Sequence, residues 1–243
     1  MPRRPKAAAQ VMSTIEKNIA KVAARIREAA QAVGRDPASV GLLAVSKTQP
    51  AATIREAAEA GMRDFGENYL QEALDKQGEL SELSELPLTW HFIGPIQSNK
   101  TKSIAEHFDW VHSVDRLKIA QRLSDQRPAE LPPLNICLQV NVSGEASKSG
   151  CAPEELPQLA QAVAAMPRLR LRGLMCIPAP SEDPAEQRAA FARLRALRDE
   201  LPLTLDTLSM GMSQDLEAAI AEGATWVRIG TALFGARDYG RPQ

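Results

Sequence analysis

The chain has 243 residues, 44% of them hydrophobic, enough to fill the core of one large α/β domain or two small ones. Its 29 Lys and Arg residues balance 30 Asp and Glu residues, so no net charge favours nucleic acid or an acidic membrane as a partner. No run approaches the roughly 18 apolar residues of a membrane span, and three widely spaced cysteines indicate free thiols in a reducing compartment, with the cytoplasm as the expected location.

The first predicted element is a helix over residues 10–33, with apolar side chains at helical spacing and Gly34 at its end. After it, short apolar or β-branched runs alternate with amphipathic stretches to the end of the chain. The runs predict strands over residues 40–46, 62–66, 89–93, 110–114, 135–142, 171–177, 207–210 and 225–229. The stretches predict helices over residues 51–60, 69–80, 101–107, 116–126, 153–166, 184–201 and 214–222.

Eight strands separated by helices require crossover connections and therefore a parallel sheet. Two architectures fit, a closed (β/α)8 barrel and an open doubly wound sheet. The count of eight and the chain length favour closure, and no Gly-x-Gly-x-x-Gly turn follows the first strand. We therefore expect an α/β fold with a single domain over residues 1–243, a TIM-type (β/α)8 barrel with an extra N-terminal helix.

Lys47 stands where the functional residues of such a barrel gather, at the carboxyl end of the first strand. The apolar run before it predicts a buried position, where lost hydration favours the neutral, nucleophilic amine that Schiff-base chemistry needs. The alternative is a lysine whose ammonium reaches solvent from the strand end.

A phosphate site is predicted at the loops after the seventh and eighth strands, where many barrels bind phosphate. Ser213 is predicted to be the N-cap of the helix over residues 214–222, so that its hydroxyl and the neighbouring amides face an anion. The eighth strand ends at Arg228, Gly230 and Thr231, where Gly230 permits a close backbone approach and Thr231 adds a donor. The alternative is a capping serine and an ordinary turn glycine.

Seven runs of the sequence resemble the pyridoxal phosphate homeostasis protein family, in the family's order and over residues from about 10 to 239. They are AVSKT (44–48), FGENYLQE (65–72), HFIGPIQSNK (91–100), QVNVS (139–143), RGLM (172–175), LSMGMS (208–213) and VRIGTALFG (227–235). Each run is weakly specific, and the seven together are highly specific. Residues 1–10 lie outside the match, and we expect them to be flexible.

The resemblance implies a fold-type III barrel, similar to the N-terminal domain of alanine racemases. It implies pyridoxal 5′-phosphate (PLP) as the cofactor, held as a Schiff base on Lys47. The other contacts that it implies are the phosphate with Ser213, Gly230 and Thr231, the pyridine nitrogen with Arg228, and the nearby side chains Asn68 and Met212.

The chemistry of these residues argues against strong catalysis. A guanidinium only donates, so a pyridine nitrogen that accepts from Arg228 stays unprotonated, and the ring is a poorer electron sink. Racemisation needs acid and base groups on both faces of the substrate α-carbon. Of the two tyrosines, Tyr69 begins a predicted helix and Tyr239 lies in the tail, and neither has an evident reason to face Lys47.

Three functions remain open. The first is a PLP-binding protein of intracellular PLP homeostasis, a carrier or buffer that delivers PLP to PLP-dependent apo-enzymes. The second is a weak PLP-dependent amino-acid racemase or a related enzyme, and the third is a barrel that binds another phosphorylated metabolite without a covalent link. The missing second base favours the first function over the second, and the place of Lys47 favours it over the third.

Several smaller expectations complete this interpretation. We expect a monomer with no nucleic-acid or membrane partner and no metal, since His91, His107 and His112 lack zinc spacing and are better read as satisfied or surface residues. Lys148, in the small-residue loop over residues 143–151, is either solvated or takes part in phosphate contact or cofactor transfer.

Overall fold

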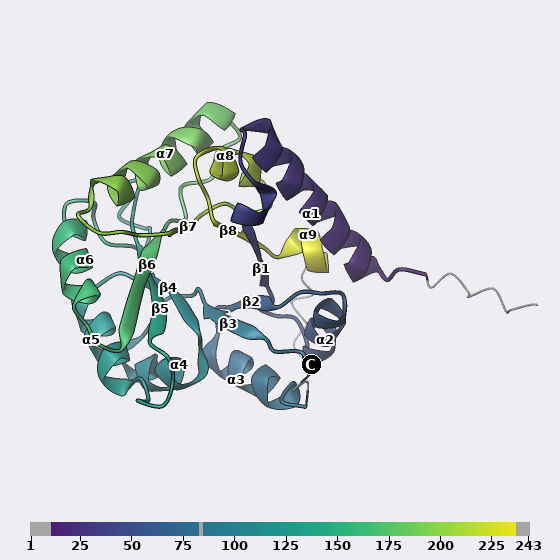
Figure 1. The fold of residues 1–243 in the computed structure, drawn as a ribbon, viewed down its shortest axis with the longest axis horizontal. Helices are drawn as coiled ribbons and strands as arrows, with labels where there is room; N and C mark the ends of the chain where they lie inside the picture. Colours follow the sequence, from purple (N-terminus) through teal and green to yellow (C-terminus); the bar gives the residue numbers. More distant parts are fainter. Residues whose placement is uncertain (1–10, 83–84, 237–243) are drawn as a thin grey trace, which may run out of the picture.

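The computed structural model describes residues 11–82 and 85–236. Within these ranges the strands form one closed parallel barrel in the order β1 to β8, and β8 pairs with β1 to close it (Figure 1). The strands are β1 (Gly41–Val45), β2 (Asp64–Glu67), β3 (Thr89–Phe92), β4 (Trp110–Val114), β5 (Leu134–Gln139), β6 (Leu169–Met175), β7 (Thr207–Ser209) and β8 (Trp226–Ile229). The predicted closed barrel is confirmed, and the open sheet is excluded.

Helices surround the barrel on its outside (Figure 1). They are α1 (Thr14–Ala32), α2 (Ala51–Glu59), α3 (Leu70–Glu79), α4 (Thr101–His107), α5 (Leu117–Gln126), α6 (Leu156–Ala164), α7 (Pro184–Glu200), α8 (Leu216–Ala221) and α9 (Thr231–Phe234), with short 3-10 helices at Pro37–Ser39 and Ser98–Lys100. The predicted helices all form, with boundaries shifted by a few residues. The 3-10 helices and α9 were not predicted.

The extra N-terminal helix α1 covers the seam where the barrel closes. Ser13 caps it, since the Ser13 hydroxyl accepts the Glu16 N–H at 3.1 Å and the Glu16 carboxylate accepts the Ser13 N–H at 2.6 Å. The buried side chains Val22, Ile26 and Ala30 form its inner face, and the helix lies against α8 and α9 (Figure 1).

The barrel interior holds polar as well as apolar side chains. His91 on β3 contacts Trp226 on β8 with ring centroids 5.1 Å apart, and Trp110 on β4 contacts the same indole at 6.1 Å. Because β3 and β4 are not neighbours of β8, these contacts cross the interior. The larger apolar cluster lies between the strands and the surrounding helices.

None of the helices in residues 11–82 and 85–236 is long and apolar enough to cross a membrane. The single domain over residues 1–243 stays a prediction, and the expected flexibility of residues 1–10 falls outside the described residues.

Candidate functional site

A cavity of about 690 Å³ lies at the end of the barrel where the strands finish. The residues that follow β1, β2, β6, β7 and β8 contribute to its wall. The wall includes every residue that the sequence analysis selected for the cofactor, together with the lysine of the 143–151 loop: Lys47, Asn68, Lys148, Met212, Ser213, Arg228, Gly230 and Thr231. The pairing of β8 with β1 brings the two ends of this set together.

Lys47 lies one residue beyond Ser46, which is fully buried, and its own side chain is partly exposed in the cavity wall. The next residue, Thr48, has a φ of 66°, a left-handed conformation that is rare for a β-branched residue. The Thr48 N–H donates to Glu72 Oε1 at 2.6 Å, and this bond holds the turn.

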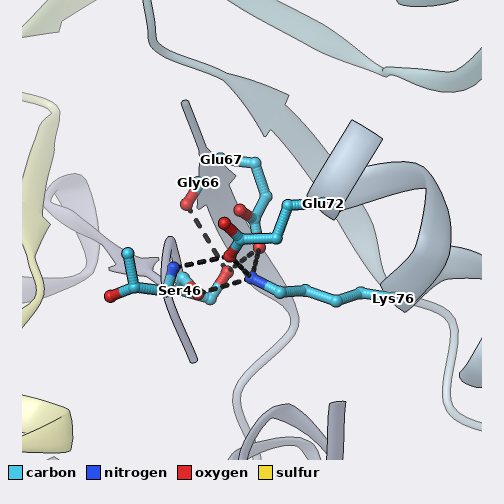
Figure 2. Close-up of polar contacts among 6 residues, drawn as sticks. Ser46, Gly66, Glu67, Glu72 and Lys76 are labelled. Atoms are coloured by element: carbon cyan, nitrogen blue, oxygen red, sulfur yellow. Dashed lines mark hydrogen bonds and ion pairs between the residues drawn. The ribbon is translucent and has the colours of Figure 1, made fainter. Parts of the chain in front are cut away.

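An ion cluster made of Lys76, Glu67 and Glu72 lies next to that turn, with Lys76 and Glu67 buried and Glu72 partly exposed (Figure 2). The Lys76 ammonium donates to Glu67 Oε1 at 2.8 Å, to Glu72 Oε1 at 2.5 Å and to the backbone carbonyl of Ser46 at 2.8 Å. The Ser46 hydroxyl donates to Glu67 Oε1 at 2.8 Å. Burial raises the pKa of the Glu67 carboxyl, while Lys76 lowers it.

The sequence analysis missed this cluster. The one signal available was the i, i+4 spacing of Glu72 and Lys76 in a predicted helix, and such pairs are usually solvated. Here the Lys76 side chain is only 6% exposed, so its ammonium lies in the interior of the protein and not in solvent.

Asn68 follows β2 and carries an unused acceptor. Its Oδ1 atom is buried and has no hydrogen-bond partner among the described residues. Gly94 allows the close approach of the next strand end, since a Cβ at position 94 would lie 2.5 Å from the Asn68 carbonyl oxygen. A buried acceptor of this kind suits a ligand that brings a donor.

The prediction of Ser213 as a helix N-cap is wrong. Helix α8 begins at Leu216 with Asp215 at its N-cap, and Ser213 lies in the turn before it. The reason is local, because Asp215 Oδ1 accepts the Met212 N–H at 2.7 Å and the Asp215 N–H donates to the Met212 carbonyl at 3.2 Å. The turn therefore closes before the helix starts. Ser213 still lines the cavity.

Arg228, on β8, forms hydrogen bonds with residues at the ends of β6 and β7. Its guanidinium is buried and donates from Nη1 to Ser209 Oγ at 2.8 Å and from Nη2 to the Cys176 carbonyl at 2.9 Å. Its backbone N–H donates to the Gly211 carbonyl at 2.9 Å. Burial lowers the pKa of Arg228, but guanidinium is so basic that it stays charged.

The strand β8 runs directly into α9, with Gly230 at the N-cap and Thr231 as the first helical residue. Gly230 has a φ of −115°, which other residues also adopt. Its conformation therefore does not require glycine, and the predicted close backbone approach of a ligand at Gly230 stays a prediction.

At the cavity rim, Met212 is 46% exposed. Lys148 lies in the wall, and its loop is held by the Asn141 side chain, which donates to the Glu145 carbonyl at 2.8 Å and accepts the Gly144 N–H at 3.1 Å. Both interpretations of Lys148 remain open.

The described part of the chain has no tyrosine opposite Lys47. Tyr69 is the N-cap of α3, is 54% exposed and does not belong to the cavity wall. Tyr239 lies outside the described residues.

The cavity thus combines a primary amine, a buried cation and hydroxyl and amide groups from two adjacent loops. An amine condenses with a carbonyl group, a guanidinium donates to a ring nitrogen or an anion, and hydroxyl and amide groups donate to phosphate. The donor set fits a small phosphorylated molecule that bears a carbonyl carbon.

Comparisons with known proteins agree with this chemistry. Residues 17–238 match the family described as alanine racemase, N-terminal domain. The chain is 79% identical to the pyridoxal phosphate homeostasis protein of Pseudomonas aeruginosa, over 95% of this chain and 99% of that protein. It is 56% identical to the protein of the same name from Escherichia coli, over 95% of this chain and 100% of that protein. The structure of PipY from Synechococcus elongatus with PLP bound matches with a TM-score of 0.80 and 41% identity, over 91% of this chain and 100% of that chain.

Proposed function

Since this chain belongs to the pyridoxal phosphate homeostasis protein family, we propose that it binds PLP and acts in PLP homeostasis as a carrier or buffer without strong catalysis of its own. The observation that carries the proposal is the meeting of Lys47, Arg228 and the loops after β7 and β8 in one cavity. PLP has one group for each of them: an aldehyde, a pyridine nitrogen and a phosphate.

In this proposal Lys47 holds PLP covalently. PLP would supply an aldehyde carbon, and the Lys47 amine would be the nucleophile that binds it reversibly, with loss of one water. The ion cluster of Lys76, Glu67 and Glu72 fixes the backbone on both sides of Lys47 and so limits the positions that the amine can take.

The remaining contacts orient the ring. Arg228 would donate to the pyridine nitrogen, and Ser213, Gly230 and Thr231 would donate to the phosphate. Asn68 would present its buried acceptor nearby, and Met212, which lines the same cavity, would lie beside the ring.

Homeostasis requires release as well as binding. We propose that recipients are PLP-dependent apo-enzymes, that the protein acts as a monomer in the cytoplasm, and that Lys148 at the cavity wall takes part in transfer. The nearly balanced overall charge of the chain supports a protein that meets many partners without a strong electrostatic preference.

The two other functions have less support. A racemase needs a second acid/base group opposite Lys47, and within the described residues no tyrosine lines the cavity. A purely non-covalent phosphate binder gives no reason for Lys47 to line the same cavity as the buried guanidinium of Arg228.

The test is the absorbance spectrum of the purified protein with PLP, followed by borohydride reduction and peptide mapping. A Schiff-base band should appear, and reduction should fix the cofactor on Lys47 and not on Lys148. Lys47→Ala should lose the band and keep the circular-dichroism spectrum of the wild type. The exposed-site control Lys102→Ala, on α4, should keep the band. A wild-type protein that forms no band in excess PLP contradicts the proposed function.

A further inference from the structure

A continuous chain of side-chain contacts runs through the barrel interior, from the cavity wall to the opposite end of the barrel. Arg228 Nη1 lies 2.8 Å from Ser209 Oγ, which lies 2.7 Å from His112 Nδ1. His112 Nε2 lies 2.9 Å from His91 Nδ1, and His91 Nε2 lies 2.8 Å from Asp64 Oδ1. The side chain of Asp64, the first residue of β2, is 28% exposed, whereas the other four residues are buried.

The direction of each hydrogen bond in this series follows from the residues at its two ends, Asp64 and Arg228. Asp64, as a carboxylate, only accepts, so His91 carries its proton on Nε2. Burial lowers the pKa of His91, and it lowers that of His112 further, so both rings are neutral and each has a single N–H. His91 Nδ1 therefore accepts from His112 Nε2, and His112 Nδ1 accepts from the Ser209 hydroxyl. Ser209 Oγ accepts from Arg228, which has donors only.

The polar hydrogens in this series of hydrogen bonds all point away from Arg228 and toward Asp64. The negative end of each dipole consequently faces the guanidinium. Among the described residues, no carboxylate forms an ion pair with Arg228, so these dipoles and the Cys176 carbonyl stabilise its buried charge, together with the more distant charge of Asp215. Aligned hydrogen bonds in a low-dielectric interior polarise and strengthen one another.

We propose that Asp64, His91, His112 and Ser209 form a relay that positions Arg228 against the pyridine nitrogen of PLP and sets how well this guanidinium donates to it. The proposal rests on the proposed function, because that function assigns the pyridine contact to Arg228. None of the four residues lines the cavity, so they are positioning residues. A substitution of Asp64, at the opposite end of the barrel, should therefore weaken the hydrogen bond from Arg228 to the ring nitrogen.

The first test uses the protein without cofactor. The chain has three histidines, so their imidazole ¹⁵N resonances can be assigned with single variants. His91 and His112 should both be neutral with the proton on Nε2. His107 is the internal reference, because its Nδ1 lies 2.8 Å from the Ser103 carbonyl and carries the proton there. A His112 ring that is charged near neutral pH, or protonated on Nδ1, overturns the relay.

The second test compares PLP with its 1-deaza analogue, in which a C–H group replaces the ring nitrogen. Asp64→Asn keeps the size of the side chain and removes its charge. It should weaken PLP binding by about 5- to 10-fold, the effect of losing one outer hydrogen-bonding partner. The affinity for the analogue should stay within about twofold of the wild-type value, because no ring nitrogen is present for Arg228. Ser209→Ala, next to Arg228, should give the same selective loss.

Asp36→Asn is the matched control. Asp36 is a carboxylate in the segment before β1 whose Oδ1 accepts the Ala38 N–H at 2.9 Å, outside the relay. This variant should leave both affinities unchanged. Equal losses for the two ligands in Asp64→Asn, or no loss for either, overturn the relay. A wild-type protein without a Schiff-base band contradicts the proposed function instead, and the histidine tautomers still test the relay.

Discussion

Lys76 Nζ donates to the backbone carbonyl of Ser46 at 2.8 Å, so a buried ammonium on α3 holds the residue directly before Lys47 (Figure 2). The same ammonium contacts Glu72, which accepts the N–H of the residue directly after Lys47. A local lysine and glutamate pair on a helix thus becomes part of the support for a functional residue on another element. Removing this support should measurably lower the free energy of unfolding.

Lys76→Met should destabilise the fold, because it leaves the buried carboxyl of Glu67 without its cation. Removing one partner of a buried ion pair typically costs about 3–5 kcal/mol. The free energy of unfolding, measured by urea denaturation without PLP, should fall by about that amount. The double variant Lys76→Met with Glu67→Gln should recover part of the loss. If Lys76→Met costs no more than Lys102→Met at an exposed site, the cluster does not stabilise the fold.

Stability should also fall in mild acid because of His91 and His112. Burial holds the pKa of both rings below the ordinary histidine value, to which the unfolded chain returns at about 6.5. Below that pH the unfolded state binds protons that the folded state does not, so the folded state loses stability as the pH falls toward the folded-state pKa values. Each such proton contributes at most about 1.4 kcal/mol per pH unit.

Urea denaturation at about pH 7.5 and about pH 5.5 measures this dependence, and the window follows from the ordinary histidine pKa. His112→Asn should flatten it, because the variant lacks one of the two buried rings. The same slope in His112→Asn and in the wild type would show that His112 does not titrate as described.

The phosphate contacts predict a strong preference for PLP over pyridoxal. Thr231→Val removes one hydroxyl donor, and a hydrogen bond to a charged group is worth about 1.5–3 kcal/mol, or roughly 10- to 150-fold in affinity. PLP should bind more weakly by that factor, measured by titration of the absorbance band, while pyridoxal binding should not change. Thr53→Val, on α2 and outside the cavity wall, is the control. Equal wild-type affinity for PLP and pyridoxal would rule out a phosphate site.

Amino acids should undergo little turnover in the cavity. Positioned acid/base catalysis is worth about 10²–10⁴-fold, and the described residues place no tyrosine opposite Lys47. With alanine or serine in deuterated water, exchange of the α-proton followed by NMR should be no faster than with free PLP. Exchange many times faster, and abolished by Lys47→Ala, would establish an enzyme and reject the carrier function.

Sequence reasoning succeeded where local patterns decide the structure. The alternation of apolar runs with amphipathic stretches predicted the barrel, and the position of Lys47 after the first run predicted a place in the cavity wall. It failed at Ser213, because a serine before a helical pattern resembles an N-cap. The sequence does not reveal that the Asp215 carboxylate turns back to the Met212 N–H and delays the helix.

The sequence by itself determined which residues lie at the strand ends, and hence which side chains a barrel gathers around its cavity. It read His91 and His112 as satisfied or surface residues and said nothing of Lys76. Only the tertiary structure decided that the two histidines join Asp64 to Arg228. The reason is physical: periodicity reports which face of one element a side chain occupies, whereas contacts across a barrel depend on the register of strands that are not neighbours.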